Sequence, residues 1–197
     1  MAKELTKEEL RIKELEKQLK GFQDKAKKQK KNGYINVPND TLVILKSNVE
    51  GVFIINEQKG ANPLFAKLPE YSYTINMTYK EVSMLVSSRN KFFTKGRIAV
   101  VEIISPDDDV SYEDVIKALR LDAIYLDENK VNPAKIEDIF DKKCSTDKFR
   151  KLVENTPEMH DTVLEVAGKL FKDGKFNDNE KMNVIRQIYR NIHLFNN

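Results

Sequence analysis

The sequence predicts an α+β protein with an N-terminal extended helix, a small mixed β-sheet domain containing one helix, and a C-terminal bundle of about five short helices. β-branched and apolar runs concentrate between residues 34 and 105, which is typical of strands. From residue 106 onward the chain carries repeated helix-start signals instead. We therefore divide it into a basic, heptad-like helical arm (1–33), a small β-rich α+β domain (34–105) and a helical domain (106–197).

The arm begins with a capped, amphipathic helix. Thr6 and Glu9 have the spacing of a capping box. Apolar side chains then follow the spacing of a coiled-coil seam, interrupted at Glu8, and they are Leu5, Ile12, Leu15, Leu19, Phe22 and Ala26. Because an isolated helix of this length is marginally stable in water, we expect the seam to bind a partner protein. The alternative is that it folds back on its own domain.

A run of lysines ends the arm before Asn32 and Gly33, and it comprises Lys25, Lys27, Lys28, Lys30 and Lys31. Lysines near a helix C-terminus interact favourably with the helix dipole, so a solvated helix end accounts for them. The alternative function is that of a nucleic-acid-binding or regulatory protein that uses these lysines on phosphates. No aromatic side chain interleaves with the run, so stacking on bases is not expected.

The β-rich domain is expected to hold strands at residues 41–45 and 51–55, joined as a hairpin through Ser47, Asn48 and Gly51. Residues 56–69 contain Gly60, Pro63 and Pro69 and predict a loop. Apolar and polar residues alternate from Tyr71 to Asn76, which predicts a half-buried strand.

A capping box at Thr78 and Glu81 then opens a helix, whose apolar face is expected to carry Val82, Leu85 and Val86. The run from Arg97 to Ile104 predicts a final strand, which makes the expected order β-β-β-α-β.

The helical domain is predicted from its helix starts. They are Ser111 with Asp114, Asn132 with Pro133, Ser145 or Thr146, Thr156 with Pro157, and Asn177 with Glu180. Asp173 and Gly174 supply an end signal. The boundary with the preceding domain is expected at residues 105–109.

Two adjacent aromatic residues, Phe92 and Phe93, follow the polar residues 87–91. Two neighbours on a strand point to opposite faces, so one of them is a candidate anchor for a partner protein. The alternative is that both pack under different elements of the same core.

The sequence indicates no catalytic residue, no metal ligand set and no cofactor. His160 and His193 lie far apart, and Cys144 has no second cysteine with which to bind a metal or form a disulfide. Residues 173–180 lack the glycine and the ligand spacing of a calcium loop. Asp107 to Asp109 are interpreted as a solvated loop, with a divalent-cation site as the alternative.

The compartment is expected to be the cytoplasm. The single cysteine gives no support for an oxidising compartment. The start lacks the apolar region of a signal peptide, and no apolar run is long enough for a membrane helix. No membrane partner is therefore expected. From the seam of the arm we expect other protein subunits as partners, in an oligomer or a larger assembly, and the lysine run adds phosphate contact as the alternative.

Three segments together resemble a small module from structural proteins of tailed bacteriophages. They are residues 45–53, with a serine-asparagine turn, residues 73–82, which lead into a threonine-capped helix, and residues 88–93, with the double phenylalanine. The resemblance spans residues 42–104. It implies a non-enzymatic virion component of the head, neck or tail, present in the host cytoplasm and the virion. The N-terminal helix lies outside the resemblance, and its apolar seam predicts that the protein docks through it.

Overall fold

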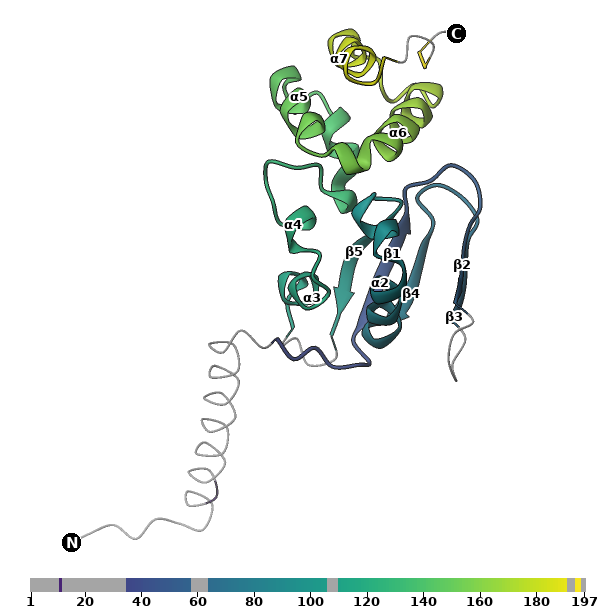
Figure 1. Ribbon diagram of the computed structural model, residues 1–197, viewed down its shortest axis with the longest axis vertical. Coiled ribbons are helices and arrows are strands. Elements are labelled where there is room, and N and C mark those ends of the chain that lie inside the picture. The colour runs from purple at the N-terminus through teal and green to yellow at the C-terminus, as the bar shows by residue number, and fades with distance from the viewer. Residues whose placement is uncertain (1–10, 12–34, 58–63, 106–109, 191–193, 196–197) are drawn as a thin grey trace, which may run out of the picture. The chain divides into compact units, whose positions relative to one another are not determined.

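The computed structural model describes residues 11, 35–57, 64–105, 110–190 and 194–195, and these form a mixed α+β protein (Figure 1). Val37–Asn197 form one compact unit. The predicted boundary at residues 105–109 falls within this unit. The predicted N-terminal helix lies outside the described residues, apart from Arg11.

The central sheet has three strands in the order β4-β1-β5, namely β4 (Thr74–Thr78), β1 (Leu42–Ser47) and β5 (Ile98–Ile104). Both outer strands pair antiparallel with β1. The prediction of a mixed sheet is therefore wrong. The parallel strands β4 and β5, linked by a helix, are separated by β1, so no parallel pair forms. Arg97 precedes β5, and the predicted strand at 97–104 is otherwise confirmed.

Strands β2 (Phe53–Glu57) and β3 (Leu64–Leu68) pair only with each other within the described part, as an antiparallel ribbon. The predicted hairpin between the first two strands is wrong, and β3 lies in the predicted loop 56–69. The chain leaves the sheet at Asn48, whose buried Nδ2 donates to the carbonyls of Gly96 and Pro133, both at 2.9 Å. Because both partners lie far from Asn48 in the sequence, the chain after Ser47 turns away from β1 and does not pair with it.

Strand β4 begins three residues later than predicted. Ser72 has a positive φ of 62°, which is incompatible with an extended strand. The neighbouring Tyr71 is held outside the sheet, because its Oη donates a hydrogen bond to Glu137 Oε1 at 2.8 Å. Residues 71–73, the first half of the alternating segment, therefore form a turn, and only residues from Thr74 onward form the strand.

Helix α2 (Tyr79–Thr94) begins as predicted and packs across the three-stranded sheet (Figure 1). The N–H of Glu81 donates to Thr78 Oγ1 at 3.4 Å, and the N–H of Thr78 donates to Glu81 Oε2 at 2.8 Å. Its buried face comprises Val82, Leu85, Val86 and Phe93. The capping box and the apolar face are confirmed.

Helix α2 is kinked at Arg89, where φ is −136° and ψ is 40°. Just before the kink, Ser87 Oγ donates to the carbonyl of Ser83 and Ser88 Oγ donates to that of Leu85. Serine hydroxyls that bond to the preceding turn compete with the helical ladder and bend helices.

Beyond β5 the described chain is helical. The elements are α3 (Tyr112–Ala118), α4 (Asp122–Tyr125), the 3-10 helix η1 (Pro133–Phe140), α5 (Thr146–Glu154), the 3-10 helix η2 (Pro157–Met159), α6 (His160–Lys172) and α7 (Asn179–Tyr189). The predicted caps at Ser111, Asn132 and Ser145 each accept a backbone N–H and are confirmed.

The start predicted at Thr156 with Pro157 is confirmed in position, because η2 begins at Pro157. Its cap bond is absent, since the buried Thr156 hydroxyl accepts the N–H of Val131 and donates to the carbonyl of Leu152. The start predicted at Asn177 is one residue too early. Helix α7 is capped by Asp178 rather than Asn177, and the Asp178 carboxylate accepts the first-turn N–H groups of Glu180 and Lys181. Asp173 and Gly174 end α6 as predicted.

Gly96, which precedes β5, offers a test of the packing between the sheet and the helices. Its φ is +68°, and a Cβ there would overlap the buried Cε of Met159. We expect Gly96→Ala to lower the free energy of unfolding by about 2–3 kcal/mol in urea titrations. Gly174→Ala is the matched control, because Gly174 has a φ of +69° and open space around it. Its cost of about 1 kcal/mol isolates the backbone strain. Equal losses would contradict the overlap with Met159.

Candidate protein-interaction surfaces

The outward face of the β2–β3 ribbon exposes apolar side chains. Val52, just before β2, is 57% exposed, and Ile54 is 54% exposed. The register places Ile54 opposite the exposed Lys67 of β3. Exposed apolar side chains that lie together on a rigid element are typical of protein-contact surfaces.

The opposite face of the ribbon is anchored in the protein core. Ile55 and Leu68 are almost fully buried, and the ring of Phe53 meets that of Phe92 edge-on at a centroid distance of 5.0 Å. This arrangement holds the ribbon against α2, so that Val52 and Ile54 are presented outward on a supported strand. The sequence did not distinguish the two faces, because positions 52 to 55 are all apolar and show no alternation.

The predicted anchors Phe92 and Phe93 lie on helix α2 rather than on a strand. Phe93 is fully buried, and Phe92 is half-buried against Phe53. Both rings therefore pack within this chain, under different elements, as the alternative interpretation has it.

The other predicted site residues lie outside the part of the chain that the structure describes. They are the seam residues Leu5, Ile12, Leu15, Leu19 and Phe22, and the lysines Lys25, Lys27, Lys28, Lys30 and Lys31. Their roles stay predictions.

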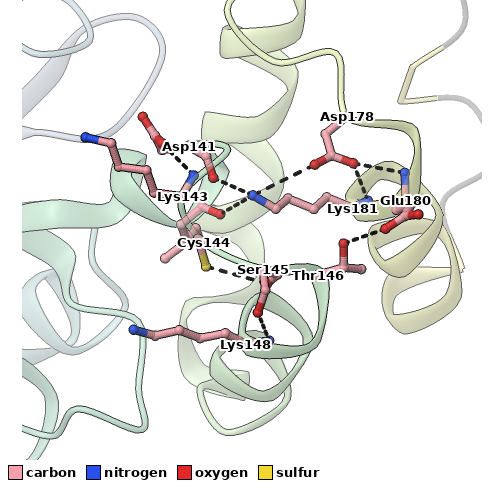
Figure 2. Close-up of polar contacts among 10 residues, drawn as sticks. Asp141, Lys143, Cys144, Ser145, Thr146, Lys148, Asp178, Glu180 and Lys181 are labelled. Atoms are coloured by element: carbon pink, nitrogen blue, oxygen red, sulfur yellow. Dashed lines mark hydrogen bonds and ion pairs between the residues drawn. The ribbon is translucent and has the colours of Figure 1, made fainter.

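The connection between η1 and α5 forms a polar cluster around Lys181, shown in Figure 2. Lys181 is 1% exposed, and its Nζ reaches from α7 to donate to the carbonyls of Asp141 at 2.6 Å and Ile139 at 3.2 Å. Asp178 Oδ2 lies 4.0 Å from the same amine. The ring of Phe149 lies 5.8 Å away. The amine thus binds the last carbonyls of η1 and fixes the path of the loop.

Cys144 lies on this loop and lines a cavity of about 670 Å³. Lys130, Lys135 and Lys148 line the same cavity, as do Asp127, Glu128 and Asp138. Because the two signs balance, the cavity shows no preference for an anionic or a cationic ligand. Among the described residues, the thiol makes its single hydrogen bond with the carbonyl of Ser145, at 3.8 Å. A catalytic thiol needs an adjacent group that accepts its proton, and the Ser145 carbonyl is not such a base.

His160 lies at the start of α6, where its ring meets that of Tyr189 edge-on at 4.6 Å. Its Nε2 atom is buried and has no hydrogen-bond partner within the described part. No group of three or more His, Cys, Asp or Glu side chains in the described ranges is placed to hold a metal ion.

Several titratable groups bond across the junction between the strand-rich and helical parts. Glu165 Oε1 accepts the N–H of Glu50 at 3.2 Å, and Thr162 Oγ1 donates to the carbonyl of Lys95 at 2.6 Å. Burial raises the pKa of the Glu165 carboxyl above its ordinary value. Burial and the nearby Glu137 raise the pKa of Tyr71. These bonds join the strand-rich and helical parts, which lie in one compact unit.

Among the residues that the structure describes, no helix combines the length and the apolar composition that a membrane crossing requires. Comparison with known proteins finds no matching family model, no matching curated protein and no matching solved structure.

Proposed function

We propose that this chain is a non-enzymatic assembly protein, which joins copies of itself or other subunits in a larger protein complex. It contacts its partners through the N-terminal seam and through the outward face of the β2–β3 ribbon. In the form that the sequence resemblance favours, the complex is the head, neck or tail of a tailed-phage virion.

The exposed pair Val52 and Ile54 is the observation that carries this proposal. More than half of the accessible surface of each residue is in contact with solvent. Burial of apolar surface contributes about 25 cal/mol per Å², so such a pair stabilises a protein–protein contact. The Phe53–Phe92 contact and the buried Ile55 already fix the strand beneath it. Docking there therefore requires little additional ordering of the backbone.

Light scattering tests the assembly. We expect the full chain to show a molar mass above the 22.8 kDa of one copy. The double variant Val52→Ser with Ile54→Thr should reduce that mass, because it removes the apolar contact and keeps a β-branched residue in the strand. A chain starting at Tyr34 should reduce it as well, since it lacks the seam.

Met84→Gln is the matched control, because Met84 is 43% exposed and belongs to α2 rather than to a ribbon strand, and glutamine is a good helix former. It should leave the molar mass unchanged. A full chain that remains monomeric at high concentration would contradict self-assembly and leave only the binding of other subunits. An oligomer that none of the changes affects would contradict the two proposed contact surfaces. The virion form has its own test, which is detection of the chain by mass spectrometry in purified particles of the virus that encodes it.

A further inference from the structure

Strand β5 is an edge of the central sheet, and part of its outer edge is closed by two tyrosine hydroxyls. Tyr112 Oη donates to the carbonyl of Val100 at 2.8 Å. The N–H of Val100 donates to Tyr125 Oη at 3.2 Å, and that hydroxyl in turn donates to the carbonyl of Ile98 at 3.4 Å. Burial raises the pKa of both hydroxyls, so both stay protonated at neutral pH. At Val100 the two side chains therefore take the place of a neighbouring strand.

Beyond Val100 the edge is open. The register with β1 shifts between Ile44 and Leu45, which leaves Val101 without a partner residue. Such a bulge bends the strand and changes the direction of its edge groups. Glu102 pairs with Ile44 of β1, so the backbone groups of the outer edge beyond Val100 are those of the bulged Val101 and of Ile103. Within the described ranges, no residue outside the central sheet hydrogen-bonds to them. An unprotected edge of this kind is a template for pairing with another strand.

This open edge lines a groove. Val101, Glu102 and Ile103 form one side of a cavity of about 620 Å³. The other side comes from α3, α4, η1 and the residues next to them, and it comprises Val110, Tyr112, Glu113, Tyr125, Leu126, Asn132, Ala134 and Lys135. Figure 1 shows α3 and α4 beside β5. The volume falls within the range of about 300–1,000 Å³ of ligand sites.

Two charges of this groove are available to a ligand. Glu113 is paired with Lys117 at 3.3 Å. Glu102 and Lys135 are both exposed, and neither has an ion pair with another described residue. Lys135 lies on the η1 side and Glu102 on the strand side. A ligand with one acidic and one basic side chain complements them.

We propose that the outer edge of β5 beyond Val100 receives an extended peptide strand of a partner protein. The strand carries apolar side chains at alternate positions, an acidic side chain that meets Lys135 and a basic one that meets Glu102. Main-chain hydrogen bonds to Val101 and Ile103 contribute the affinity, and the groove walls select the side chains. This site is separate from the ribbon face that carries the proposed function.

The probe is a capped synthetic peptide of alternating valine and threonine with one lysine and one aspartate, prepared in both sequence orders. We expect one of them to bind the full, nitrogen-15-labelled chain with a Kd below about 1 mM. The amide resonances of residues 101–103 should shift. The same peptide with N-methylated backbone amides should bind at least about tenfold more weakly, because it keeps the side chains and loses the backbone donors.

Reversing the charge of Lys135 tests whether it contacts the acidic side chain of the peptide. Lys135→Glu should weaken the aspartate peptide severalfold, and a peptide with lysine in place of aspartate should recover that loss. Lys135 is exposed, so the variant should remain folded, which circular dichroism checks. The Val52→Ser, Ile54→Thr variant should bind the peptide normally, so that failure of the ribbon proposal and failure of this one are distinguishable. Equal binding of the N-methylated peptide, shifts confined to other residues or no binding at 1 mM would overturn the proposal.

Discussion

Replacement of Lys181 by alanine is expected to lower the free energy of unfolding by about 3–5 kcal/mol. The substitution removes a fully buried side chain and leaves the carbonyls of Ile139 and Asp141 without their shared donor. Lys181→Met keeps most of the volume and loses the amine, so about 2–3 kcal/mol is expected from the two orphaned carbonyls. Urea denaturation followed by circular dichroism measures both values.

Lys175→Ala is the control for the loss of a lysine as such, because Lys175 is exposed. It should change the free energy of unfolding by less than about 0.5 kcal/mol. A methionine variant as stable as the unmodified chain would show that the two carbonyls find water instead, and that Lys181 acts only through the packing of its stem.

Phe93→Ala is expected to cost about 3–5 kcal/mol, because it empties a fully buried ring position beneath α2. Phe92→Ala should cost less, about 1–2 kcal/mol, since that ring is half-buried and contacts Phe53 at its edge. The same denaturation experiment compares the two neighbours. The pair is a matched one, since both are phenylalanines in the last turns of one helix.

The two variants should also differ in their effect on assembly. Phe92→Ala releases the anchor of the ribbon and should reduce the molar mass of the oligomer at concentrations where the chain is still folded. Comparable stability losses for the two variants would contradict the burial difference. An unchanged oligomer in Phe92→Ala would show that the ribbon keeps its position without the aromatic contact.

Local signals predict the caps whose side-chain oxygen accepts an N–H of the first helical turn. Thr78 with Glu81 and Ser111 with Asp114 form the capping boxes that their spacing predicts. Thr156 shows where such reasoning fails. The sequence around it has the form of a cap, yet its hydroxyl bonds to Val131, 25 positions away. A side chain with a buried distant partner is not available to its own helix.

Strand pairing was the larger difference between prediction and structure. The pattern at residues 51–55 predicts a strand paired with its nearest neighbour in sequence, whereas β2 (Phe53–Glu57) pairs with β3. The buried bonds of Asn48 to Gly96 and Pro133 join segments that a local pattern does not connect. The exposure of Val52 and Ile54 depends on this pairing, so the ribbon surface was not predictable either.

The α+β class, helix α2 with its buried face, and most of the later helix starts follow from the amino-acid sequence alone. These features depend on hydrophobic periodicity and on hydrogen bonds within one turn. The antiparallel order β4-β1-β5, the separate ribbon and the groove beside β5 depend instead on how the chain packs in three dimensions. Each of these is set by the competition of distant segments for the same backbone groups and the same buried space, which the order of residues along the chain does not display.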